Sequence, residues 1–118
     1  MKAVVYDEYA PDDNYAKILK VKDIDDPKPK ANEVVLKLKA AALNYNDIWG
    51  MRGEPIAIPL PHVSGSDAAG EVVEVGEDVQ NIKVGDRVVS HSNLACRVCD
   101  MCTSGREFDC AKRQVWGF

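Results

Sequence analysis

Short segments in which apolar and polar residues alternate dominate the chain, and this period of two predicts a protein built mainly of β-strands. The segments with this pattern, or with a short apolar run of strand length, are Met1–Asp7, Ile18–Ile24, Glu33–Leu43, Ala69–Val75 and Arg87–His91. Gly76 and the pair Gly85-Asp86 are turn positions, where glycine permits a positive φ. Many short strands divided by Gly and Pro predict a partly open β-barrel with short helices.

Proline and asparagine residues mark the expected breaks between these strands. The stretch Asp25–Lys30 is a connection, because its two prolines lack a backbone donor and push the preceding residues out of helical conformation. Asn46 is placed to cap a single helical turn that runs through Trp49–Met51 and ends at Gly53. An extended loop follows, and its prolines are Pro55, Pro59 and Pro61.

Length and composition indicate one soluble globular domain. The chain has 118 residues, of which 46% are hydrophobic and 29% are charged, as expected for a single domain with its own core. The net charge of −4 argues against an electrostatic nucleic-acid surface, and no apolar run reaches membrane-spanning length. We therefore expect no nucleic-acid partner and no membrane, and these features together with the thiolate chemistry of the cysteines described next predict a cytoplasmic location.

The four cysteines of the chain all lie in one short segment. They are Cys96, Cys99, Cys102 and Cys110, in a C-x2-C-x2-C-x7-C pattern. Four thiolates offer Zn²⁺ a closed tetrahedron with sulfur atoms at about 2.3 Å, and two intervening residues let neighbouring sulfurs reach one ion. Because no position is left for water, the pattern predicts one structural zinc in a loop of residues 94–114.

Three other states of these cysteines stay open from the spacing alone. Two disulfides are typical of secreted domains, whereas this chain has no signal peptide and its cysteines are clustered. An iron–sulfur cluster also uses C-x2-C-x2-C, but the bacterial pattern continues with three residues and a Cys-Pro pair, which this chain lacks. Free thiols are the remaining alternative.

Several common catalytic motifs are absent. No Gly-x-Gly-x-x-Gly occurs, and the stretch Gly65–Gly70 is not followed by the Lys-Ser/Thr of a phosphate loop. No Gly-x-Ser-x-Gly occurs either, and a Ser-His-Asp arrangement has no support from the sequence. The chain therefore contains no nucleotide-binding βαβ unit of its own.

Several segments taken together resemble the medium-chain dehydrogenase/reductase superfamily. They are Leu43–Asp47, Gly65–Gly76, Val84–Val88 and the cysteine segment, in the order that this superfamily shows. The resemblance implies an N-terminal catalytic domain with a GroES-like fold, followed in the longer enzyme by a nucleotide-binding Rossmann domain. It also implies an NAD(P)-dependent oxidoreductase that is a homo-oligomer at full length. The chain alone is expected to bind NAD(P) poorly and to be inactive.

The resemblance also separates two zinc sites. The zinc-dependent alcohol dehydrogenases of this superfamily hold a structural zinc with four cysteines that match those found here. Their catalytic zinc takes a Cys where this chain has Asn44 and a His where it has Ser66, beside an acidic residue matched by Asp67. Because neither an amide nor a protonated hydroxyl is a competent zinc ligand at neutral pH, we expect the catalytic zinc to be lost.

Asn44, Tyr45 and Asn46 further resemble the zinc-independent branches, which are quinone oxidoreductases and crotonyl-CoA carboxylase/reductases. This resemblance implies hydride transfer to a conjugated enoyl or quinone-type small molecule. It implies catalytic roles for Asn44, Asn46 and His62, and a cofactor contact for Tyr45. Each residue also has a structural alternative, since Asn is a good helix cap, Tyr45 is a possible core aromatic and His62 a possible partner for backbone groups.

Two other functions stay open. One is a zinc-dependent alcohol dehydrogenase with substituted ligands, which predicts two zinc ions per chain. The other is a stand-alone binding module stabilised by zinc, which predicts no affinity for a nicotinamide.

Overall fold

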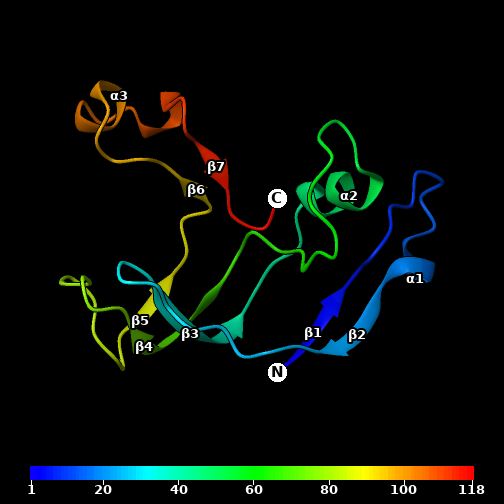
Figure 1. Cartoon of the computed structure of the whole chain (residues 1–118), viewed down its shortest axis with the longest axis horizontal. Helices are drawn as coiled ribbons and strands as arrows, with labels where there is room; N and C mark the ends of the chain where they lie inside the picture. Colours follow the sequence, from blue (N-terminus) through cyan, green and yellow to red (C-terminus); the bar gives the residue numbers. More distant parts are fainter.

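The computed structural model describes residues 1–118, which form three small antiparallel sheets joined by short helices and long connections (Figure 1). The elements are β1 (Lys2–Val5), α1 (Tyr15–Ile18), β2 (Lys20–Asp23), β3 (Val34–Ala40), α2 (Tyr45–Arg52), β4 (Ala69–Val75), β5 (Arg87–Val89), β6 (Asn93–Leu94), α3 (Asp100–Thr103), the 3₁₀ turn η1 (Glu107–Asp109) and β7 (Gln114–Val115). The sheets are β1-β2, β3-β4-β5 and β6-β7. They do not close into a barrel, which agrees with the partly open architecture predicted.

The main core lies between the β1-β2 hairpin and α2. Its buried residues are Tyr6, Ala10, Ile18, Met51 and Ile58. An ion pair ties the loop before α1 to the end of α2, because Arg52 donates to both carboxylate oxygens of Asp13 at 2.5 and 2.7 Å. The C-terminal end of α2 is therefore held both by this ion pair and by the packing of Met51 in the core.

The three-stranded sheet is antiparallel, and the pairing of β3 with β4 contains two shifts of register. Leu38 pairs with Gly70, and Glu71 pairs with both Lys37 on β3 and Arg87 on β5. These opposite charges lie across from one another and favour this register. The register shifts between Val35 and Leu36 and again between Leu38 and Ala40.

The α2 helix begins two residues earlier than the sequence indicated. Asn44, with φ −123° and ψ 159°, is the N-cap, and its backbone N–H donates to the Asp47 carboxylate at 2.8 Å. The prediction that Asn46 caps the helix is therefore wrong, because the carboxylate three residues beyond Asn44 satisfies the earlier N–H. The predicted end is confirmed: Gly53 is the C-cap, with a left-handed φ of +74°.

Each predicted strand region contains a strand; the bounds of β4 match the prediction, and those of the other strands differ. Ile18 belongs to α1 and packs in the core, whereas β2 begins at Lys20. The third strand ends at Ala40, so residues 41–43 lie outside it. The positive φ expected at Gly85 is present at +93°, but Gly76 has none. The short elements α1, α3, β6 and β7 were not predicted, because pieces of two to four residues carry no measurable period.

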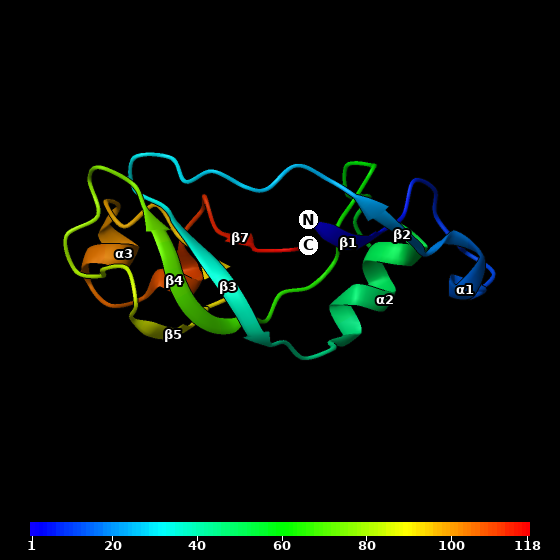
Figure 2. The ribbon, with the colours of Figure 1, turned by 90° about the horizontal axis from the view of Figure 1, so that it is seen from below.

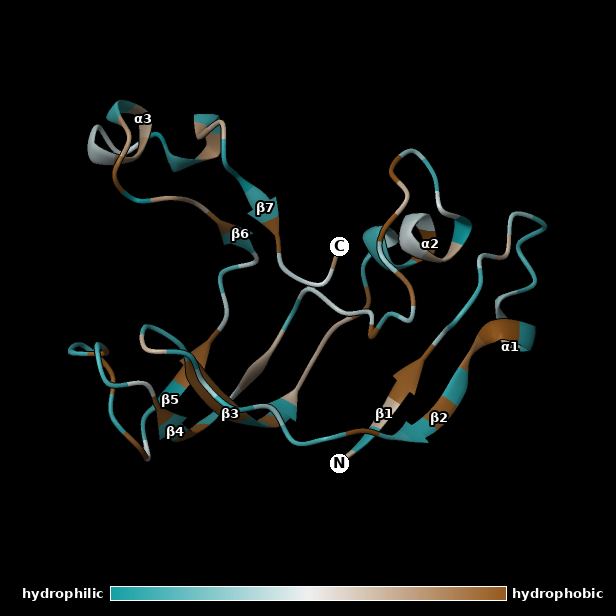
Figure 3. Cartoon of the chain, viewed as in Figure 1, coloured by the Kyte–Doolittle hydropathy of each residue, from teal (hydrophilic) through white to brown (hydrophobic).

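The molecule is elongated, with extents of 44 × 33 × 20 Å. Figure 2 shows α1 at one end and the turn that carries α3 at the other. Its radius of gyration of 15.8 Å exceeds the value of about 13.5 Å expected for a compact domain of this length. Only 14 of 118 residues are buried, and hydrophobic ribbon such as β1 and α1 alternates with hydrophilic connections (Figure 3). None of the helices has the length and apolar character that crossing a membrane requires.

Candidate functional site

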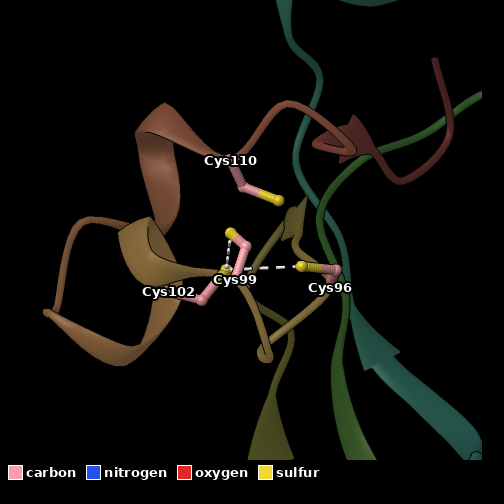
Figure 4. A group of neighbouring side chains, drawn as sticks. All are labelled: Cys96, Cys99, Cys102 and Cys110. Atoms are coloured by element: carbon pink, nitrogen blue, oxygen red, sulfur yellow. Dashed lines mark hydrogen bonds between the residues drawn. The ribbon is translucent and has the colours of Figure 1, made fainter.

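The four cysteines converge at one end of the molecule, although they come from different local elements (Figure 4). Cys96 follows β6, Cys99 is the N-cap of α3, Cys102 lies within α3 and Cys110 follows η1. All four sulfur atoms lie within 4.8 Å of one another. The Cys96 and Cys99 sulfurs are 3.9 and 3.5 Å from that of Cys102, close to the edge of about 3.8 Å that a tetrahedral Zn–S₄ centre requires.

Backbone donors favour a thiolate in this cluster. The N–H groups of Val98 and Cys99 point at the Cys96 sulfur, and they lower the pKa of that thiol to about 6. Burial acts in the opposite direction on Cys102 and raises the pKa of its thiol to about 12, a cost that a bound cation offsets. All four cysteines are free of disulfides. Their donor set, spacing and N–H···S contacts fit a structural zinc ion.

The second candidate site surrounds the N-terminus of α2. The Asn44 side-chain amide donates to the Asp67 carboxylate at 2.5 Å. The buried Asp47 carboxylate accepts from the Ser64 hydroxyl at 2.7 Å and from the Asn44 backbone N–H. The helix cap and the segment before β4 are thus joined by a chain of hydrogen bonds, which fixes the Asn44 side chain.

The residues at this second site do not fit a catalytic zinc. The Asn44 amide donates to a carboxylate, and Ser66 is 3% exposed with a hydroxyl that has no hydrogen-bond partner in the protein. An amide and a neutral hydroxyl give a weak donor set beside the single carboxylate of Asp67. The arrangement is suited instead to binding a ligand through hydrogen bonds.

Tyr45 and Asn46, the next two residues of the predicted site, lie on the first turn of α2. Tyr45 is 60% exposed and packs edge-on against Trp49, with ring centroids 5.3 Å apart. Asn46 is half-buried. A groove beside this aromatic pair is lined by Trp49, Arg52, Glu54 and Pro55. The aromatic face is thus available to a planar ligand.

His62, the third predicted catalytic residue, contacts Tyr6 and Gly117. Its backbone pairs with Tyr6, and its ring packs against the Tyr6 ring at 5.5 Å. Its Nε2 lies 3.2 Å from the Gly117 carbonyl oxygen. The structure therefore joins His62 to Tyr6, just after β1, and to the C-terminal segment, and no hydrogen bond links it to Asn44 or Asn46.

Comparison with known proteins shows which family this architecture belongs to. The profile of the alcohol dehydrogenase GroES-like domain matches residues 30–118. The chain belongs to this family. It is the N-terminal domain found in the medium-chain dehydrogenase/reductase superfamily, as the sequence predicted.

Individual relatives include both alcohol dehydrogenases and acyl-CoA reductases. An alcohol dehydrogenase of Geobacillus stearothermophilus is 35% identical over 120 residues, covering 100% of this chain and 34% of that protein. An acryloyl-coenzyme A reductase of Metallosphaera sedula is 38% identical over 93 residues, covering 79% of this chain and 28% of that protein. The chain thus spans about a third of the length of these relatives.

Solved structures give the same result. An NAD-dependent alcohol dehydrogenase matches with a TM-score of 0.87 and 39% identity, over 99% of this chain and 33% of that one. A crotonyl-CoA carboxylase/reductase matches with a TM-score of 0.86 and 28% identity, over 100% of this chain and 28% of that one.

The hydrogen bond between Ser64 and Asp47 was not predicted from the sequence. The two residues are 17 positions apart, and their hydrogen bond depends on how the proline-rich loop folds back over α2. The spacing of the two residues along the chain carries no signal for such a contact.

Proposed function

We propose that this chain is the N-terminal catalytic domain of an NAD(P)-dependent oxidoreductase that reduces a conjugated enoyl or quinone-type substrate. The observation that carries the proposal is the hydrogen bond from the Asn44 amide to Asp67. It puts a neutral hydrogen-bonding group where a zinc-dependent alcohol dehydrogenase needs a metal ligand. Relatives that act on acryloyl-CoA and crotonyl-CoA support this substrate class.

The chemistry divides between this chain and the cofactor. A reduced nicotinamide, when bound, supplies the hydride for such a reduction. This chain has no phosphate-binding loop for it, because the stretch Gly65–Gly70 leads into strand β4 rather than into a helix. Its own contribution is the pocket: Asn44 and Asn46 hydrogen-bond the substrate or ribose, and the exposed Tyr45 ring packs against the cofactor.

His62 acts in this proposal by positioning other groups. Its Nε2 holds the Gly117 carbonyl and its ring holds Tyr6, so it fixes the loop that precedes Ser64. Because Ser64 donates to Asp47, this loop supports the N-cap of α2. His62 therefore helps to orient the pocket residues indirectly, through this loop.

We further propose that the four cysteines hold one zinc ion with a structural role. Four protein ligands leave no open coordination position for a substrate. The ion would fix residues 94–114, which connect the three-stranded sheet to the C-terminal segment. It would take no part in hydride transfer.

The decisive experiment combines metal analysis with two activity assays on the full-length enzyme. We expect one zinc per chain, NAD(P)H oxidation with crotonyl-CoA or a quinone, and no oxidation of simple alcohols, because no Lewis acid lowers the hydroxyl pKa. Two zinc ions per chain together with alcohol oxidation would show the zinc-dependent dehydrogenase instead. A protein without any affinity for a nicotinamide would instead support the stand-alone binding module stabilised by zinc.

The cytoplasmic location and the homo-oligomeric state of the full-length enzyme stay predictions. Fractionation of cells and light scattering of the purified enzyme test them directly.

A further inference from the structure

The second histidine of the chain lies at the end of the β4-β5 ladder, next to the site. Ser90 donates its backbone N–H to the Ala68 carbonyl at 2.7 Å, and Ala68 donates its own N–H to the Ser90 hydroxyl at 3.0 Å. Beyond this pair, the next residues are Asp67 on the β4 side and His91 on the β5 side. The last hydrogen bonds of the ladder therefore bring His91 to the end of the sheet that carries Asp67.

The His91 ring has a defined tautomer. Its Nδ1 accepts the backbone N–H of Asn93 at 3.1 Å. A backbone N–H can only donate, so Nδ1 carries no proton and the neutral ring holds its proton on Nε2. His91 is exposed, and no protein group accepts from its Nε2 in the structure. It is an oriented donor that no protein group uses.

The two histidines differ in this respect. His62 has its Nε2 against the Gly117 carbonyl, so that nitrogen is already occupied by the protein. His91 is occupied at Nδ1 and free at Nε2. The two rings are therefore held by opposite nitrogens, and for His91 it is Nε2 that has no protein partner.

The surroundings of His91 supply the rest of a ligand site. Asp67 holds the Asn44 amide, which fixes a second polar side chain at the same end of the sheet. Polar side chains thus gather around Asp67, as in sites that recognise a small polar ligand.

We propose that His91 is a substrate-contacting residue whose Nε2–H donates a hydrogen bond to the carbonyl oxygen of an enoyl thioester bound beside Asn44. The inference rests on the function proposed above. When hydride reaches the β-carbon, the electron pair of the C=C bond moves toward the carbonyl, and negative charge collects on its oxygen. A fixed N–H donor stabilises this enolate more than it stabilises the substrate. Solvent then supplies the proton at the α-carbon, and His91 keeps its own.

Nitrogen NMR of the ¹⁵N-histidine-labelled protein tests the geometry without any activity. We expect the long-range ¹H–¹⁵N spectrum to show His91 as the Nε2–H tautomer, assigned by the loss of its signals in His91→Gln. Binding of a saturated acyl-CoA should shift the Nε2 resonance. An Nδ1–H tautomer, or an Nε2 resonance that does not respond to ligand, would overturn the proposal.

Steady-state kinetics of the full-length enzyme test the role. His91→Leu should lower kcat for crotonyl-CoA by about 100-fold with a smaller change in KM, as expected for loss of one donor to an oxyanion. His91→Gln, which keeps an N–H donor, should recover activity to within about tenfold of wild type. Asn81→Leu, an exposed polar-to-leucine change in the β4–β5 connection, is the control and should leave kcat unchanged.

The outcomes separate this inference from the proposed function. A folded His91→Leu variant with wild-type kcat overturns the role of His91 alone. A wild-type enzyme that does not reduce any enoyl thioester overturns the proposed function and the substrate assigned to His91 together. The melting temperature of each variant shows whether it is folded.

Discussion

Tyr6 shows how much a single buried polar atom matters in this small core. Its side chain is fully buried, and its hydroxyl has no hydrogen-bond partner in the protein. Burial is also the main reason that the pKa of Tyr6 is raised to about 12. The neighbouring Tyr9 differs, because its hydroxyl donates to the Ile58 carbonyl at 2.6 Å.

This contrast predicts opposite effects for the same substitution. Tyr6→Phe should raise the free energy of unfolding by about 1 kcal/mol, because it removes a buried donor that has no partner. Tyr9→Phe, the matched control, should lower it by about 1 kcal/mol, because the Ile58 carbonyl loses its hydrogen bond. Urea unfolding monitored by circular dichroism measures both. If Tyr6→Phe destabilises the protein as much as Tyr9→Phe does, an ordered water must bind the Tyr6 hydroxyl.

Asn44 combines a structural and a chemical role at one position. Its extended backbone ends the segment before α2, and its side chain reaches across to Asp67. The sequence indicated Asn44 as a pocket residue and also as a good cap, and the structure shows that the backbone caps while the side chain remains at the pocket. Its chemical role stays a prediction.

At the scale of elements, the cysteine segment cannot hold its shape through secondary structure. The α3 helix has four residues, η1 has three and the β6-β7 pair has two on each strand. Helices this short are unstable in water without tertiary support. Only two residues of this segment are buried, and both are cysteines, Cys102 and Cys110. A metal ion is therefore the main candidate for what orders this segment.

Removal of a buried ligand should therefore unfold the segment locally. Cys110→Ser should reduce the zinc content from one ion per chain to less than one tenth, because a neutral hydroxyl replaces a thiolate ligand. Amide exchange within residues 94–114 should become fast, whereas the amides of β4 should stay protected. Ser104→Ala, in the same segment, should keep the zinc. Full zinc content in Cys110→Ser would contradict a four-cysteine centre.

At the scale of the whole molecule, the C-terminal segment joins parts that are far apart in sequence. It leaves β7 and returns to the centre of the molecule (Figure 1), where Gly117 lies against Gly65 and accepts a contact from His62. A Cβ atom on Gly117 would lie 2.0 Å from the Gly65 carbonyl oxygen, and the φ there is +79°. The backbones approach too closely for any side chain.

Gly117→Ala should accordingly destabilise the protein more than the left-handed backbone alone explains. We expect a loss of about 3 kcal/mol, from backbone strain together with displacement of the segment around Gly65. Gly105→Ala is the matched control, since Gly105 has a similar φ of +78° with open space around it, and it should cost about 1 kcal/mol. Thermal unfolding compares the two. Equal losses would show that the contact with Gly65 is not tight.

Local patterns of the sequence were enough to predict much of this protein. The alternation in residues 69–75 predicted β4 with correct bounds, and Gly53 predicted the end of α2, because both signals lie within a few neighbouring residues. The cysteine spacing predicted the cluster that the structure forms, since the ligands of a zinc loop lie close in sequence. The resemblance to the superfamily predicted the family.

The tertiary structure decided everything that depends on distant segments meeting. The pairing of Asp47 with Ser64, the anchoring of His62 by Gly117, and the position of His91 beyond the Ala68–Ser90 pair each join residues from separate elements. A hydrogen bond between such residues depends on the packing of the whole chain, and no local period or propensity encodes it. The sequence therefore identified the polar residues available, and the fold determined which of them are occupied by the protein and which remain free for a ligand.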